Sequence, residues 1–268
     1  NVVTISMTEH MNFWAVYHHY IDNVNYSLFS NINMVKQMNT FNKKTNVGGV
    51  NIETNKSYLS NKNLYFGNTK FDNIPDTEFI INKFNLNKND KYCLFLYPKM
   101  RNNFSVENIL NIYSHLKKLG FKIIVKSRPK DHKIEEILQG DIFIKSDTYP
   151  NESLQLMKIS DLCIISSSSA NEETVFSKIP CIDLISDLRP WERNQYLLDE
   201  KTYVRIENKD WKDIKFENFK KIYQKLEKKN SLYFDEIKTK YLFTHNNTSK
   251  KIFDFLKEKH PEYFKNII

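Results

Sequence analysis

The chain has 268 residues, 40% of them hydrophobic, and its 40 Lys and Arg against 32 Asp and Glu give a formal net charge of +8. This length suits one large α/β domain, or one complete domain with part of a second, and rules out a disordered chain of low hydrophobicity. The lysines are scattered and no basic helix occurs, so the charge favours a phosphorylated ligand or an anionic membrane surface over nucleic acid.

The first part of the chain alternates short strands with connections. Strands are predicted at 2–6, 26–29 and 64–66, a helix at 31–38, and a polar loop at 42–62. His10 follows the first strand, where it could face a cleft, although a structural role is the more common one for such a histidine. This part is too short for a complete doubly wound sheet, so we expect a partial N-terminal Rossmann-like domain at 1–75.

A regular alternation follows a connector helix and linker at 76–90. Strands are predicted at 92–97, 122–126, 142–144, 162–165, 181–184 and 203–206. Helices are predicted at 106–119, 134–138, 152–159, from 170, at 216–229 and at 249–259. This spacing predicts right-handed βαβ units and a parallel sheet. The expected fold class is therefore α/β, with a complete C-terminal Rossmann-like domain at 91–215 and C-terminal helices at 216–268.

Several features bear on the compartment. Cys93, Cys163 and Cys181 lie in apolar runs that predict buried strands, and their odd number and spacing fit no metal site. We therefore expect reduced thiols and a cytoplasmic protein. No apolar run is long enough to cross a bilayer and no signal peptide occurs, so membrane association is expected to be peripheral, at the inner face. The chain opens on Asn1 and an apolar run, which indicates that it begins in mid-domain.

The stretch 162–184 predicts a buried strand, a polar loop, a short helix and a second buried strand. Four serines, Ser166–Ser169, stand at the turn, and Glu172 and Glu173 lie in the first turn of the helix. Such a junction presents hydroxyls, amides and a positive helix end at the carboxyl edge of a parallel sheet, where phosphorylated ligands bind. Helix starts prefer Ser and Glu without any ligand, but four consecutive serines exceed what a cap requires.

Polar groups follow other predicted strands as well. Lys126 and Arg128 come at the end of one strand, and further polar groups follow three others, at 97–99, 146–149 and 186–189. Because parallel strands present their carboxyl ends to one edge, these groups are expected to converge there. Arg128 is suited to pair with a diphosphate in bidentate fashion, with Lys126 adding charge, although a solvated strand end explains each residue equally well when taken singly.

Four segments resemble a known group of proteins. The segment SSSSANEETVFSKIPCIDL (166–184) resembles the Ser/Gly loop, Glu pair and Pro-led strand of hydrolysing UDP-N-acetylglucosamine 2-epimerases. It is also similar to the Ser-Ser loop of CDP-glycerol glycerophosphotransferases and related capsule-polysaccharide transferases. The segments LYFGNTKFDNI (64–74), YCLFLYPK (92–99) and KSRPKDH (126–132) resemble the interdomain stretch, first C-domain strand and basic-Pro loop of such two-Rossmann (GT-B) proteins.

The resemblance implies a C-terminal domain that binds a nucleotide-activated sugar or a CDP-polyol. Ser167, Ser168 and Ser169 would cradle the diphosphate, and Glu173 would bind the ribose hydroxyls with Glu172 assisting. The fold places catalytic groups mostly on the N-terminal domain, where His10 is the imidazole that ends an early strand. Because a base that titrates near neutrality suits the deprotonation of an acceptor hydroxyl, His10 is the candidate catalytic residue.

The sequence departs from the epimerase pattern. Ser166, Ser168 and Ser169 stand where the epimerase loop has Asp and glycines, and Arg128 stands where a His is usual. The acidic residues of the epimerase N-terminal domain find no match here. These departures favour the transferase branch of the resemblance.

Three functions follow from this comparison. The first is a glycosyltransferase-like enzyme of surface polysaccharide biosynthesis, which transfers a sugar or polyol phosphate from a nucleotide-activated donor to a glycan or lipid-linked acceptor. The sequence contains no Asp-X-Asp motif that would indicate a metal site, and no cofactor is expected besides the donor, which is a substrate. The alternatives are a UDP-N-acetylglucosamine 2-epimerase-like enzyme and a non-catalytic nucleotide-sugar-binding module. No nucleic-acid partner is expected.

Overall fold

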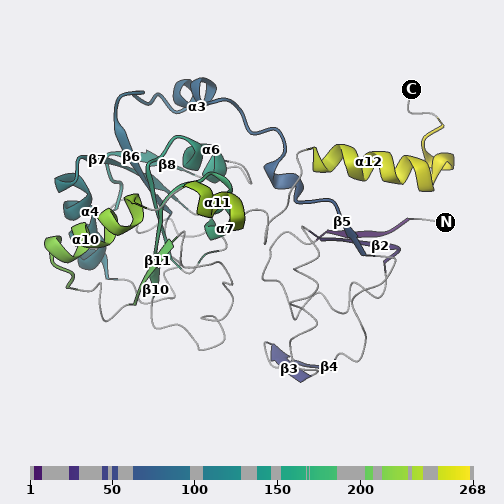
Figure 1. Ribbon diagram of the computed structural model, residues 1–268, viewed down its shortest axis with the longest axis horizontal. Helices are drawn as coiled ribbons and strands as arrows, with labels where there is room; N and C mark the ends of the chain where they lie inside the picture. The colour runs from purple at the N-terminus through teal and green to yellow at the C-terminus, as the bar shows by residue number, and fades with distance from the viewer. Residues whose placement is uncertain are drawn as a thin grey trace. The chain divides into compact units, whose positions relative to one another are not determined.

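The computed structural model divides the chain into two compact units, Asn1–Asn73 with Lys238–Ile268, and Ile74–Ile237 (Figure 1). We call them unit 1 and unit 2. The structure describes residues 3–7, 24–29, 44–47, 50–53, 63–96, 105–127, 138–145, 152–166, 168, 170–185, 203–207, 213–228, 231–237 and 247–265. The domain boundaries at 75, 90 and 215 stay predictions.

Unit 2 is built on a six-stranded sheet in which every pairing is parallel, as the sequence predicts. Its order is β11-β10-β9-β6-β7-β8. The strands are β6 (Lys91–Leu96), β7 (Phe121–Lys126), β8 (Ile142–Ile144), β9 (Leu162–Ile165), β10 (Cys181–Ile185) and β11 (Tyr203–Glu207). The chain builds outward from β6 to β8, then returns to the other side of β6 with β9 and builds outward again. The order therefore reverses between β6 and β9.

Helices cover both faces of this sheet (Figure 1). α4 (Val106–Lys118) and α10 (Phe216–Glu227) bury their apolar stripes against one face. The core there includes Phe95, Ile112, Leu116, Ile123, Ile164, Ile182 and Phe219. The elements α3 (Thr77–Lys83), α6 (Glu152–Lys158), α7 (Ala170–Phe176) and α11 (Ser231–Ile237) form the other layer, in which α6 lies against β6 and α7 against β9. The three cysteines lie fully buried in β6, β9 and β10, as predicted.

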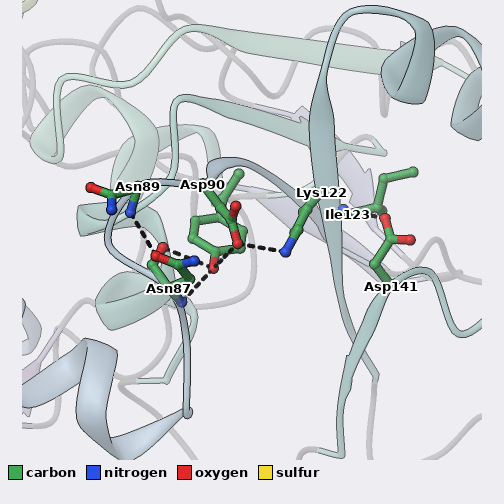
Figure 2. Close-up of polar contacts among 7 residues, drawn as sticks. Asn87, Asn89, Asp90, Lys122, Ile123 and Asp141 are labelled. Carbon is green, nitrogen blue, oxygen red and sulfur yellow. Dashed lines mark hydrogen bonds and ion pairs between the residues drawn. The ribbon is translucent and has the colours of Figure 1, made fainter.

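Aspartates hold the amino-terminal edge of the sheet in register. The Asp161 carboxylate accepts the N–H of Tyr92 at 2.9 Å, while the Asp161 N–H donates to the Tyr92 carbonyl at 2.9 Å. Asp141 forms the same pair of bonds with Ile123, at 2.9 and 3.0 Å. Figure 2 shows the Asp141–Ile123 contact, together with the ion pair between Lys122 and Asp90 at 2.6 Å. Each Asp thus ties the start of its own strand to the start of another strand.

Unit 1 holds a smaller parallel sheet of order β1-β2-β5, formed by Ile5–Met7, Tyr26–Phe29 and Asn63–Tyr65. The prediction of a loop at 42–62 is wrong in part, because β3 (Lys44–Val47) and β4 (Val50–Glu53) form an antiparallel pair. Its register pairs Thr45 with Ile52 and Val47 with Val50, so β-branched residues lie opposite one another. The predicted helices at 31–38 and 134–138 lie outside the described residues, apart from Leu138.

The helix α12 (Thr248–Lys259) belongs to unit 1, although it lies far from it in sequence. Asn247 has a left-handed backbone and forms no side-chain cap, and Asp72 supplies the cap instead. The Asp72 carboxylate accepts the N–H groups of Thr248 and Ser249 at 3.0 and 2.7 Å. At the other end of α12, the Tyr26 hydroxyl lies 3.0 Å from His260 Nε2. Both ends of the helix are therefore fixed to unit 1.

Candidate functional site

The strand order of unit 2 points to one part of the sheet as a ligand site. If the strands of unit 2 are numbered 1 to 6 along the chain, starting at β6, their order in the sheet is 3-2-1-4-5-6, the order of doubly wound dinucleotide-binding sheets. In such sheets ligands bind beyond the carboxyl ends of the strands, at the point where the order reverses. In this chain that point lies between β6 and β9. The chain segments that leave β6, β7 and β9 therefore surround the candidate site.

The serine-rich connection from β9 to α7 lies at this point. The structure describes Ser166 and Ser168, whereas Ser167 and Ser169 lie outside the described residues. Ser168 is half-buried, and its hydroxyl oxygen accepts the N–H of Ala170 at 3.3 Å. The Ser168 proton can still be donated. Ser166 is only 6% exposed, and its Oγ finds no hydrogen-bond partner among the described residues.

Lys126 ends β7 at the same edge of the sheet. It is half-buried and pairs in register with Leu96 of β6 and Ile144 of β8. The ends of β7 and β9 flank the end of β6 and lie about 10 Å apart, at roughly 4.8 Å per strand. Lys126 and Ser168 are thus brought to neighbouring parts of one edge, as the convergence argument predicts. Arg128 and His10 lie outside the described residues.

The acidic pair of the helix is placed in part. Glu173 lies in α7 with a half-buried side chain, whereas the side chain of Glu172 lies outside the described residues. Burial raises the pKa of the Cys163 thiol well above 9.0, and the neighbouring charges that raise it further include the Glu173 carboxylate. α7 packs against β9, so Glu173 lies in the helix next to that strand.

Two polar residues of this region were missed by sequence reasoning. Asn108, in the first turn of α4, is 7% exposed, and Asp183, in β10, is 2% exposed. The Asp183 signal was a carboxylate inside the otherwise apolar run CIDLI. Asn108 carried no such signal, because an Asn near a helix start is expected to be solvated. In the described part of the chain, no group of three or more His, Cys, Asp or Glu residues could hold a metal ion.

Comparison with known proteins agrees with the fold. No protein-family model matches the sequence, and no curated protein matches it. Among solved structures, the wall teichoic acid polymerase TagF matches 93% of this chain with a TM-score of 0.60 at 13% identity. Its H548A variant matches 95% of the chain with a TM-score of 0.59 at 14% identity. The fold is GT-B-like.

A third similar structure is S. aureus MnaA in complex with UDP, which matches 91% of this chain with a TM-score of 0.55 at 16% identity. TagF has also been solved as its H444N variant with CDPG. The chain spans about three fifths of the length of these proteins, 61% of TagF and 62% of MnaA. At these identities the likeness establishes a shared fold. In the described residues no helix is both long and apolar enough to cross a membrane.

Proposed function

We propose that this chain is a glycosyltransferase-like enzyme that transfers a sugar or polyol phosphate from a nucleotide-activated donor in surface polysaccharide biosynthesis. The observation that carries the proposal is that the half-buried Lys126, at the end of β7, and the serines Ser166 and Ser168, after β9, flank the end of β6 in a sheet whose fold resembles TagF. The TagF structure with CDPG and the MnaA structure with UDP support a nucleotide-linked donor.

In this proposal the donor diphosphate binds at the serine loop. Ser167, Ser168 and Ser169 donate hydroxyl and amide hydrogen bonds, while Lys126 and Arg128 neutralise charge that grows on the departing phosphate. Such stabilisation acts on the transition state and requires no metal. Glu173, assisted by Glu172, accepts hydrogen bonds from the ribose hydroxyls. These roles need a water-poor site, and the burial of Ser166 and the partial burial of Lys126 are compatible with one.

We propose that the acceptor is a glycan or a lipid-linked glycan, with the enzyme bound peripherally at the inner face of the membrane. His10 removes the proton of the attacking hydroxyl, because a neutral imidazole is available near pH 7. His10→Ala is then expected to abolish transfer while nucleotide binding persists.

The decisive experiment is a thermal-shift panel of UDP, CDP, CMP and GDP on the full chain. A ligand that binds only the native state raises the melting temperature according to its affinity and concentration. Lys126→Ala should weaken the binding of the nucleotide with the highest affinity about tenfold or more, since charge-assisted hydrogen bonds contribute about 1.5–3 kcal/mol. Glu173→Ala should abolish the shift. Lys221→Ala, which removes an exposed lysine of α10, is the matched control and should leave the shift unchanged.

Two results count against the proposal. One is a panel in which no nucleotide raises the melting temperature. The other is an equal loss in Lys126→Ala and Lys221→Ala, which would mean that only overall charge matters.

The second candidate is a UDP-N-acetylglucosamine 2-epimerase-like enzyme, favoured by the match to MnaA in complex with UDP. Turnover of free UDP-N-acetylglucosamine without an acceptor separates it from a transferase. Nucleotide binding with neither turnover nor transfer would instead identify a non-catalytic binding module.

A further inference from the structure

The helix α12 carries a large apolar side chain outside the face that packs on unit 1. Phe255 lies on the packing face, where its ring contacts the rings of Tyr26 and Phe66. Phe253 stands two positions earlier, and helix residues two apart point in different directions. Phe253 is 44% exposed, so packing within the chain leaves much of its ring in contact with water.

A short element after α12 brings two more aromatic rings to this place. The 3-10 helix η4 (Pro261–Tyr263) follows α12, and Phe264 comes directly after it. The rings of Phe264 and Phe253 meet edge to face, with centroids 5.2 Å apart. Tyr263, the chain neighbour of Phe264, is 47% exposed. We call Phe253, Tyr263 and Phe264 the aromatic patch. Exposed apolar side chains that gather in one place, unlike single ones, mark a surface that binds something.

The charge that remains beside the aromatic patch is positive. Each acidic side chain in 248–265 has a basic partner in the same stretch: Asp254 lies 2.6 Å from Lys250, Glu258 lies 2.9 Å from Lys259, and Glu262 lies 3.5 Å from His260 Nδ1. Lys257 and Lys265 are exposed and form no ion pair with any described residue. Lys257 shares a helix face with Phe253, four residues before it, and Lys265 follows Phe264 directly.

Other exposed hydrophobic side chains have a different setting. In the described residues they are Phe79, Leu110 and Tyr233. Each of them has an acidic residue three positions away on its helix or at its cap, namely Asp76, Glu107 and Glu236. The helix α10 shows the opposite case, since it has three lysines but none of its large apolar side chains is exposed. Within the described part of the chain, exposed rings and unpaired lysines coincide only at the aromatic patch.

We infer that the aromatic patch, together with Lys257 and Lys265, is the surface by which unit 1 binds an anionic lipid bilayer. Aromatic rings insert at the boundary between head groups and acyl chains, while lysines beside them attract negative head groups. A second copy of the chain suits this surface less well, because a symmetric contact would bring the same lysines together. The inference rests on one part of the proposed function, the peripheral attachment to a membrane, and it names the residues and the lipid chemistry.

The test is co-sedimentation of the full chain with vesicles of phosphatidylglycerol and phosphatidylcholine in equal amounts, against vesicles of phosphatidylcholine alone. The anionic vesicles should bind the chain about tenfold more tightly or better, and this binding should weaken as salt is added. Lys257→Gln should weaken it about fivefold, the usual effect of one lysine near such a surface. Lys221→Gln, at an exposed lysine of α10, is the matched control and should leave vesicle binding unchanged.

Phe253→Ser tests the aromatic part of the surface. It should weaken vesicle binding about fivefold or more, because the ring no longer enters the interface. The matched control is Phe79→Ser, which removes a ring that is 54% exposed on α3 and should leave vesicle binding unchanged. Melting temperatures without vesicles check that both variants fold. If Phe253→Ser lowers the melting temperature, Lys257→Gln still decides, since its side chain is exposed.

Three results would overturn the inference. The first is a chain that does not bind anionic vesicles. The second is an equal loss of binding in Lys257→Gln and Lys221→Gln, which would mean that only overall charge matters. The third is a dimer that Phe253→Ser dissociates and that does not bind vesicles, because the aromatic patch would then be a contact between two copies of the chain.

The failure of this inference can be told apart from the failure of the proposed function. Phe253→Ser should leave the rise in melting temperature caused by a nucleotide unchanged, because the candidate donor site lies in unit 2. Vesicle binding by a chain that no nucleotide stabilises would retain the lipid surface and reject the proposed transferase. Nucleotide binding by a chain that does not bind vesicles would reject the lipid surface alone.

Discussion

Two glycines show how a single residue limits what the fold accepts. Gly140 and Gly120 both have left-handed backbones, with φ of +66° and +82°. A Cβ on Gly140 would lie 2.8 Å from the Ile123 carbonyl oxygen and 2.8 Å from Val125 Cγ2, whereas a Cβ on Gly120 would meet nothing within 4 Å. Gly140→Ala therefore adds a steric clash to the conformational strain that both substitutions share.

We expect Gly120→Ala to lower the free energy of unfolding by about 1–2 kcal/mol, the cost of a left-handed residue with a Cβ. Gly140→Ala should lower it by about 1–3 kcal/mol more, the usual cost of overpacking. Urea unfolding of both variants measures the difference. Equal midpoints would mean that the chain relaxes around residue 140 without cost.

The cysteines test burial at the same scale. Burial raises the pKa of the Cys93, Cys163 and Cys181 thiols well above 9.0. The native chain at pH 8 should therefore leave all three unmodified by iodoacetamide, and unfolding in urea should expose them to reaction, as mass spectrometry would record. Because the thiol pKa values are higher in the folded chain than in the unfolded chain, the thiols leave the free energy of unfolding unchanged below pH 9. Above pH 9 the unfolded chain loses these protons first, so the free energy of unfolding falls as the pH rises. Rapid alkylation of the native chain would contradict this burial.

At the scale of elements, the sequence predicted the strands of unit 2 well and the hairpin of unit 1 poorly. Apolar runs such as 162–165 have a single favourable place, inside a parallel sheet covered on both faces. In β3 and β4 the β-branched residues alternate with Lys, Asn and Glu, so the mean composition resembles a loop. α11 was missed for a similar reason, since it is short and its apolar Phe234 gains burial only through tertiary packing.

The candidate site could be predicted from the sequence only in part. The position of Lys126 and Ser168 at one edge of the sheet could be predicted from strand alternation, because parallel strands end at the same edge, whereas their roles in binding stay predictions. Asn108 could not be found in this way, because the sequence does not say that an Asn in the first turn of a helix is buried. Its 7% exposure depends on how α4 packs against the sheet.

The edge aspartates permit a prediction about a strand. Asp161→Ala removes the acceptor of the Tyr92 N–H, a charge-assisted bond, and should lower the free energy of unfolding by about 1–2 kcal/mol. Asp161→Asn keeps an acceptor oxygen and should retain at least half of that stability. Chemical denaturation of the two variants gives the comparison. An equal loss in both would assign the effect to charge and not to the hydrogen bond.

At the scale of the whole molecule, the chain returns at its C-terminal end to the unit in which it began. Thr248 and Asp72, which form the α12 cap, are 176 residues apart. No local pattern in the sequence could indicate this, because α12 reads only as a lysine-rich amphipathic helix, with an apolar stripe that would fit either unit. The assignment of α12 to unit 1 depends on long-range contacts such as the Asp72 cap and the packing of Phe255 on Tyr26 and Phe66.

Asp72 therefore offers a test of how stability is divided within the chain. Asp72→Ala leaves the first N–H groups of α12 without their acceptor and should cost about 1–2 kcal/mol, as the loss of a helix cap does. Hydrogen exchange should accelerate at Thr248, Ser249 and the next turn of α12, while β6 and β9 exchange at the wild-type rate. Asp161→Ala should give the reverse pattern, since its bonds lie within unit 2. Acceleration throughout both units in either variant would show that the chain opens as a single cooperative body.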